Sequence, residues 1–148
     1  MPWTIKCSDP TCTRYTGATN IVDLIDQHRD DQGWFLCSCG KKGYIVKSFK
    51  LQEVGQIWEP YLKGIIALGD EDETYQPFVF NVSYTPESHP DSVWFSYYKD
   101  LREEGGILKM GYGPGGPPVL HKDSILELIK QLVTLQIISK EEVEKAIA

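Results

Sequence analysis

The sequence predicts an α+β protein, in which an N-terminal module of one helix and one hairpin leads into an antiparallel sheet, with helices at the C-terminus. Three observations carry this prediction. All four cysteines lie in the first 39 residues, as two close pairs that mark a small module. Apolar residues alternate at strand spacing over residues 78–84. Apolar residues also recur at helical spacing after residue 123.

The predicted boundary between the two parts lies near residue 55. A chain of 148 residues has room for one domain, or for a small module joined to a larger one. Residues 1–55 are expected to form the cysteine-bearing module, and residues 56–148 the α+β portion. The second strand of the hairpin can continue into the larger sheet, which would make one domain of both parts.

The module is predicted to contain a loop, a helix and a hairpin. Prolines and a glycine punctuate residues 1–18, which predicts a loop. Thr19-Asn20 can cap a short helix to about Asp31, and Gly33 ends it. The apolar face of this helix carries Ile21, Leu24, Ile25 and His28. The two strands of the hairpin are expected at Trp34–Leu36 and Tyr44–Leu51.

Strands are predicted through the middle of the chain. Ile57–Leu68 is apolar enough for a strand, with a short helix as the alternative, and an acidic turn follows at residues 70–73. Residues 78–84 and Val93–Tyr98 are rich in aromatic residues and predict two paired strands. Two shorter pieces then follow, a loop or helical turn at Lys99–Glu104 and a short strand at Gly105–Met110.

The C-terminal third begins with an irregular stretch. Four glycines and three prolines in Gly111–Pro118 exclude a helix or a central strand. A helix is expected from about Asp123 to Gln136, because Ser124-x-x-Glu127 has the pattern of a capping box. Ser139-x-x-Glu142 is a second capping box and predicts a short final helix, with Val143 and Ile147 facing inward.

Charge is distributed unevenly and limits the partners. The net charge is -6; residues 1–55 carry seven Lys or Arg and six Asp or Glu, whereas residues 56–148 carry eight and fifteen. An acidic majority argues against a surface that wraps phosphate backbones. No apolar run approaches the roughly 20 residues that span a bilayer, and the N-terminus has no apolar core of secretory length. We therefore expect a cytoplasmic protein without membrane contact.

The cysteines have the spacing of metal ligands. Cys7-x4-Cys12 and Cys37-x-Cys39 are separated by 24 residues. Four thiolates from two short turns can hold Zn²⁺ at tetrahedral corners, and a filled shell is typical of structural rather than catalytic zinc. A reducing compartment disfavours disulfides and favours the metal. A redox role for the same cysteines is the chemical rival, although no C-x-x-C begins a helix here.

One histidine lies close enough in sequence to compete as a ligand. His28 is the only histidine of the module. It sits on the apolar face of the predicted helix, and four thiolates already fill the shell. We therefore expect a packed or surface histidine.

The second cysteine pair resembles a known zinc fold. Cys37-Ser38-Cys39-Gly40 at the tip of a hairpin is similar to the second knuckle of a zinc ribbon. The resemblance covers residues 7–47 only, and these spacings of four and one differ from the usual C-x-x-C. It implies a structural zinc ion, with backbone amides of the turn directed at the sulfurs.

Three functions remain open from the residues. The first is a non-catalytic zinc-binding protein that presents a surface to another protein. The second is a nucleic-acid-binding module, because residues 34–50 combine aromatic side chains with lysines. Proteins bind single-stranded nucleic acid through positive charges that contact its phosphates and aromatic rings on which its bases stack. The lysines concerned are Lys41, Lys42, Lys47 and Lys50. A lysine-bearing hairpin edge that merely discourages edge pairing explains the same pattern.

The third possible function is an enzyme with a site near Gly111–Pro118. His89 and His121 lie in loop-like stretches, with Asp91 and Asp123 nearby in sequence. No set of nucleophile, base and orienting group can be named from the sequence. A pocket of ligand size that joins either histidine to carboxylates would favour this function.

Overall fold

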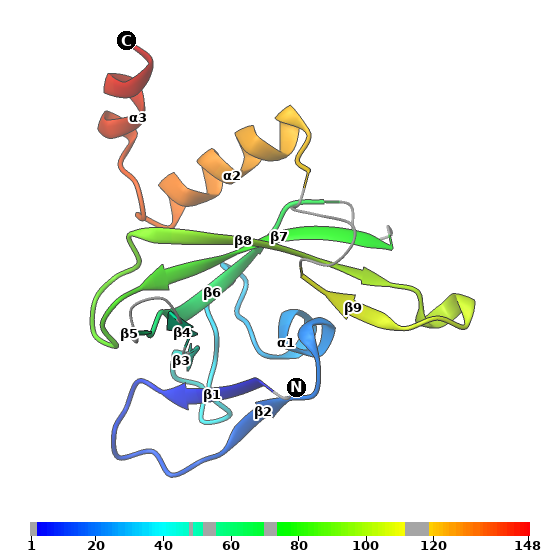
Figure 1. Ribbon diagram of the computed structural model, residues 1–148. Coiled ribbons are helices and arrows are strands. Elements are labelled where there is room, and N and C mark those ends of the chain that lie inside the picture. The colour runs from blue at the N-terminus through cyan, green and yellow to red at the C-terminus, as the bar shows by residue number, and fades with distance from the viewer. Residues whose placement is uncertain (1–2, 48, 52–55, 70–73, 112–118) are drawn as a thin grey trace. The chain divides into compact units, whose positions relative to one another are not determined.

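The protein has the predicted α+β class. The computed structural model describes residues 3–47, 49–51, 56–69, 74–111 and 119–148. Seven strands form an antiparallel sheet in the order β2-β1-β3-β6-β7-β8-β9, and β4 pairs with β5 (Figure 1). The elements are β1 (Trp3–Cys7), β2 (Thr16–Ala18), α1 (Ile21–Gln27), β3 (Gly43–Val46), β4 (Phe49–Leu51), β5 (Gln56–Trp58), β6 (Tyr61–Ala67), β7 (Tyr75–Ser83), β8 (Ser92–Asp100), a 3-10 turn (Arg102–Glu104), β9 (Leu108–Met110), α2 (Lys122–Thr134) and α3 (Lys140–Ile147).

The chain divides into two compact units. Unit 1 comprises residues 1–65 and 81–92, and unit 2 comprises residues 66–80 and 93–148. Compactness alone does not show which part folds independently, so the division at residue 55 stays a prediction. None of the described helices is long and apolar enough to cross a membrane.

The prediction of a loop over residues 1–18 was wrong for Trp3–Cys7 and Thr16–Ala18, which form β1 and β2, and is confirmed for residues 8–15. β1 buries Trp3 and Ile5 and exposes the two residues that alternate with them. β1 pairs with β2, Ile5 lying opposite Thr16, and with β3 on its other side, Lys6 lying opposite Tyr44. The apolar alternation of β1 covers only five residues, which is too short to stand out in the sequence. The strand forms because β2, which follows the turn between Cys7 and Cys12, pairs with it.

The predicted hairpin has a correct tip and a wrong partner strand. Cys37 N–H donates to Lys41 O at 2.8 Å, which closes the turn. Residues 34–36, however, make only isolated bridges, and β3 pairs instead with β1 and β6. The backbone of Trp34 approaches Gly64, where an added Cβ would lie 2.6 Å from Gly33 O. Gly64 therefore allows close contact of two backbones.

Helix α1 starts as predicted and ends early. The Asn20 side chain accepts from Asp23 N at 2.9 Å, which confirms the N-cap. The helix ends at Gln27 rather than Asp31, because His28 is its C-cap and the next residue already bridges to Phe35. Its buried residues join Phe35 and residues of four strands in the core of unit 1, which contains Ile5, Ala18, Ile21, Leu24, Phe35, Ile45, Leu62 and Ile65.

The middle region forms strands as predicted, but two of them stand where one was expected. Over Ile57–Leu68 the chain forms β5 and β6, which excludes the short helix. β7 and β8 cover the two aromatic runs, and the 3-10 turn and β9 follow them. The acidic residues 70–73, and residues 112–118 of the glycine- and proline-rich stretch, lie outside the described residues.

The start of α2 differs from its prediction. Its N-cap is His121, whose Nδ1 accepts from Asp123 N at 3.2 Å. The hydroxyl of Ser124 donates instead to Leu68 O at 2.6 Å, so Ser124 does not cap the helix. This tertiary hydrogen bond fixes α2 over the sheet of unit 2, where Leu128 and its apolar neighbours on the helix are buried.

Helix α3 is held by its cap rather than by burial. The Ser139 side chain and the Glu142 side chain satisfy each other's backbone amides, which confirms the second capping box. The prediction that Ile147 faces inward was wrong, because its side chain is 80% exposed. None of the residues of α3 is buried.

Candidate metal centre

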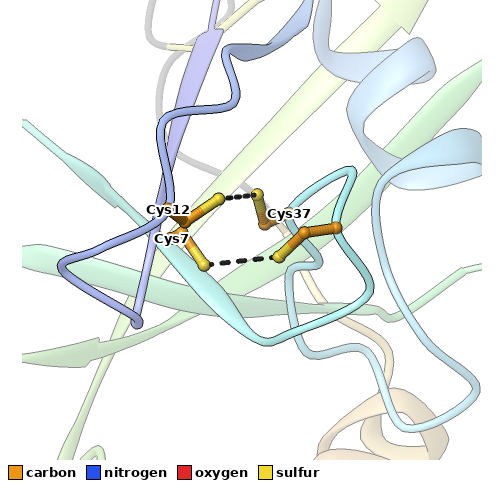
Figure 2. A group of neighbouring side chains, drawn as sticks. Cys7, Cys12 and Cys37 are labelled. Atoms are coloured by element: carbon orange, nitrogen blue, oxygen red, sulfur yellow. Dashed lines mark hydrogen bonds between the residues drawn. The ribbon is translucent and has the colours of Figure 1, made fainter.

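The four cysteine sulfurs lie close together in unit 1. All four lie within 4.8 Å of one another. The sulfurs of Cys7 and Cys39 are 3.5 Å apart, and those of Cys12 and Cys37 are 3.8 Å apart (Figure 2). A Zn–S bond of about 2.3 Å implies tetrahedral S–S edges of about 3.8 Å. The group therefore has the size of one tetrahedral metal shell.

The first pair is positioned by a turn over residues 7–12. Cys12 N–H donates to Asp9 O at 3.0 Å, and the Asp9 carboxylate accepts from both the amide and the hydroxyl of Thr11. Asp9 N–H donates to the Cys7 sulfur at 3.4 Å. The four residues between the cysteines therefore form a closed turn that brings both sulfurs to one side.

The second pair is positioned by a turn over residues 37–40. Gly40 N–H donates to Cys37 O at 2.9 Å, and Gly40 adopts φ +92°, which favours glycine. Cys37 is buried whereas Cys39 is exposed. Residues 7–12 and 37–40 are called the two cysteine turns below.

Polar contacts join the two cysteine turns to each other. Lys41 Nζ lies 2.6 Å from Asp9 Oδ2, and the Arg14 guanidinium donates to Ser38 O at 3.2 Å. The Thr16 hydroxyl donates to the Cys37 sulfur and accepts from Ser38 N–H. The ion pair holds the pKa of Asp9 well below its usual range, because Lys41 donates to the carboxylate, and the Thr11 hydroxyl and amide add to the effect.

The electrostatics of the sulfurs are uneven. The backbone amide of Cys39 and the Thr16 hydroxyl lower the pKa of Cys37 to about 6. The Asp9 amide lowers the pKa of Cys7, but desolvation and hydrogen bonds with the other thiols raise it to about 12. The Cys37 thiol therefore loses its proton more easily than the Cys7 thiol does. A bound divalent cation would favour the deprotonated form of all four cysteines.

The other predicted site residues are dispersed. Among the described residues only the four cysteines form a cluster that could hold a metal ion, and His28 is not in it. Lys41 pairs with Asp9, whereas Lys42 Nζ lies 5.1 Å from the ring centroid of Trp34 and Lys47 Nζ lies 4.8 Å from that of Trp3. The Lys50 side chain lies outside the described part of the chain.

A pocket of about 690 Å³ adjoins the first cysteine turn within unit 1. Its walls come from the first cysteine turn, from Trp34, from residues 42–44, from Lys63 and from the loop 86–90. His89 and Glu87 both line it, whereas His121 caps α2 in unit 2. The pocket thus joins one of the two predicted histidines to a carboxylate, as the third function required, but no residue of Gly111–Pro118, where that site was expected, is among its described lining.

Sequence reasoning missed several residues around the site. Asp9 and Thr16 contact the cysteines or their turns, and Lys63 enters the pocket from β6. The Asp-Pro-Thr run between Cys7 and Cys12 is a turn signal that points to Asp9. No local pattern identifies Lys63, because its neighbours in the pocket come from distant parts of the chain.

Comparison of the chain with models of known protein families, with curated proteins and with solved structures found no match.

Proposed function

We propose that the protein is a non-catalytic zinc-binding protein, in which Cys7, Cys12, Cys37 and Cys39 hold one structural Zn²⁺ in a zinc-ribbon-like arrangement. The observation that carries this proposal is the clustering of the four sulfurs: all lie within 4.8 Å of one another, and the two distances of 3.5 and 3.8 Å are close to the edge of about 3.8 Å of a tetrahedral Zn–S₄ shell. Four thiolates complete that shell and leave no position for a reacting water. The ion would connect two turns that are otherwise joined only by polar contacts.

Metal analysis of protein purified without chelator tests the site. We expect one zinc ion per chain, lost in Cys39→Ser and retained in Ser38→Ala, a matched change in the same turn. Substitution with Co²⁺ should give the visible absorption of a tetrahedral four-thiolate complex. Metal-free wild-type protein with disulfides between these cysteines would instead support the redox alternative.

We further propose that the protein works in the cytoplasm by presenting a surface to another protein. Apolar side chains on α2 support this role, since Ile125 and Leu126, consecutive in the helix, are both exposed. The protein in a native extract should migrate in an assembly larger than its own 16.8 kDa. Leu126→Asp should return it to the size of the purified chain; migration as a single chain in both cases would contradict the proposal.

Nucleic-acid binding is the second candidate, favoured by lysines that lie over aromatic rings in unit 1. Lys42 with Trp34 and Lys47 with Trp3 combine the charge and the stacking surface that single strands use. Zinc-loaded protein should then bind a single-stranded oligonucleotide at low salt, with affinity that falls as salt rises. The absence of binding at low salt would eliminate this candidate.

A further inference from the structure

The pocket beside the first cysteine turn has the dimensions of a ligand site. Its volume of about 690 Å³ lies within the range of about 300–1,000 Å³ that small-molecule pockets occupy. All of its lining residues belong to unit 1. The first cysteine turn, the segment after the second turn, β6 and the loop 86–90 each supply part of the wall, so the pocket exists only when these distant segments are folded together.

Flat and apolar groups form part of the wall. The rings of Trp34 and His89 lie with centroids 5.6 Å apart and planes inclined by 59°. Trp34 is only 7% exposed, so it is a fixed part of the wall rather than a mobile surface ring. Pro10, Pro86 and Pro90 add rigid apolar surface. A flat, apolar body would contact these groups without the need to immobilise flexible side chains.

Two ammonium groups line the same pocket. Lys42 Nζ lies 5.1 Å from the ring centroid of Trp34, and Lys63 Nζ lies 5.4 Å from that of Tyr44. Lys63 also donates to the carbonyl of Pro86. Within the described parts of the chain, no carboxylate lies within ion-pair distance of either ammonium. Their charges are met by rings and a carbonyl, which are weaker partners than an anion.

Lys63 is the more constrained of the two cations. Burial lowers its pKa, and Glu87 at the pocket wall offsets only part of this effect. A partly desolvated ammonium gains more from an anionic partner than a fully hydrated one does. Two lysines and one carboxylate line this pocket, and the Cys7 sulfur adds negative charge at one wall when the four thiolates hold a metal. The preference for an anion therefore rests on the two ammonium groups, neither of which has a described carboxylate within ion-pair distance.

We propose that this pocket binds a small organic anion, with a carboxylate or phosphate group on Lys42 and Lys63 and a flat apolar body against Trp34 and His89. The proposal goes beyond a structural metal and does not depend on which metal the cysteines hold. It accounts for the chemistry of the wall, in which cations and rings are combined at one place.

Matched ring compounds test the proposal on the purified, metal-loaded chain. Phenyl phosphate, benzoate and benzylamine share a ring and differ in the charged group, so titration followed by NMR or calorimetry separates charge from ring. Phenyl phosphate or benzoate should bind saturably, and whichever binds more tightly identifies phosphate or carboxylate as the preferred group. Equal binding of benzylamine, or no saturable change for any compound up to about 10 mM, would overturn the proposal.

Lysine variants locate the binding. Lys63→Met and Lys42→Met keep the apolar stem and should each weaken binding by about tenfold or more, the effect of losing one charge-assisted hydrogen bond. Lys109→Met removes an exposed lysine of unit 2 and should leave binding unchanged. Unchanged binding in both pocket variants would overturn the proposal.

Two further measurements separate this proposal from the others. The metal content of each variant is recorded, so that loss of metal is distinguished from loss of the ligand; retained metal with lost binding supports a role of the lysines in the pocket itself. A single-stranded deoxythymidine oligomer is titrated as well. Binding of the oligomer that depends on Lys63, without binding of either ring anion, would overturn the small-ligand proposal in favour of nucleic acid.

Discussion

The two cysteine turns of unit 1 and helix α2 of unit 2 are fixed by different forces. The turns converge through four sulfurs, an ion pair between Lys41 and Asp9, and hydrogen bonds of a few polar side chains. Helix α2 instead buries Leu128 and Leu132 on the sheet of its own unit. The free energy gained by burial grows in small steps with apolar area, whereas a metal ion is either bound by its full set of ligands or lost. We therefore expect the turns to lose their structure abruptly and the helix to be destabilised gradually.

The core of unit 1 limits how far such a failure spreads. Phe35, two residues before the second cysteine turn, is fully buried, as is Leu24 on α1. Ile5 on β1 is 1% exposed, two residues before the first cysteine. The segments that carry the turns are thus anchored by apolar side chains. Local opening of the turns, rather than unfolding of all of unit 1, is the expected consequence of losing the metal.

Removal of the metal should produce the largest difference between the two regions. After chelation, the amides of Cys12 and Gly40 should exchange at least about a hundredfold faster, because their turns lose the shared ion. The amide of Leu132 on α2 should keep its protection. Hydrogen exchange followed by mass spectrometry measures both, and added Zn²⁺ but not Mg²⁺ should restore the turns. Equal loss in both regions would contradict the comparison.

A glycine substitution tests whether the backbone of unit 1 tolerates change away from the cysteines. Gly33 has φ +91°, and an added Cβ would lie 2.4 Å from Ile65 O. Gly33→Ala should therefore cost about 3 kcal/mol of unfolding free energy, from the left-handed backbone and the contact together.

Gly105→Ala in unit 2 is the matched control for this substitution. Gly105 has φ +81° and nothing within 4 Å of an added Cβ. It should cost only about 1 kcal/mol, because only the backbone conformation is unfavourable. Urea denaturation measures both variants. Similar costs at the two positions would show that the close approach to Ile65 is unimportant.

The face of α2 should respond in proportion to buried area. Leu128 is 6% exposed, so Leu128→Ala should lower the unfolding free energy by about 2 kcal/mol. Leu126→Ala changes the same residue type at a position that is 64% exposed, and should cost less than about 0.5 kcal/mol. Urea denaturation measures the costs, and the metal content should stay unchanged in both. Loss of metal in Leu128→Ala would link two regions that we treat as separate.

Features with a local cause were predicted from the sequence. The N-cap Asn20 and the capping box of Ser139 and Glu142 each depend on residues within one turn, and both are present. The aromatic runs of β7 and β8 are long enough to show a strand pattern. The closeness of the two cysteines within each sequence pair also followed from their spacing, because a short turn brings its two ends together.

Features with a distant cause were not predicted. β1 is a strand because β2 and β3 pair with it, and Ser124 fails to cap α2 because its hydroxyl reaches Leu68 O. The pocket combines Trp34, Lys63 and His89, which lie far apart in the chain. No periodicity encodes such contacts, since each depends on how complete elements meet.

Helix α3 is stabilised by neither a metal nor burial, and we expect the smallest effect there. Because none of its residues is buried, its first turn depends mainly on the capping box, and the exposed Lys140–Glu144 pair at 4.0 Å adds little. The Ser139 amide and hydroxyl lower the pKa of Glu142 below its ordinary value. A carboxyl whose pKa is lowered on folding stabilises the folded form above its unfolded pKa of about 4.3. That contribution disappears as the pH falls through the lower, folded value.

Acidification should therefore fray the start of α3 before it affects either of the other regions. Between about pH 5 and pH 2, the NMR signal of the Ser139 amide should move toward its unfolded position as Glu142 is protonated. Glu142→Gln should remove most of this pH dependence, because its amide oxygen accepts the same hydrogen bond without titrating. Glu144→Gln, an exposed carboxylate in the same helix, should leave it intact. An identical titration of Ser139 in the wild type and in Glu142→Gln would mean that α3 is held by contacts other than its cap.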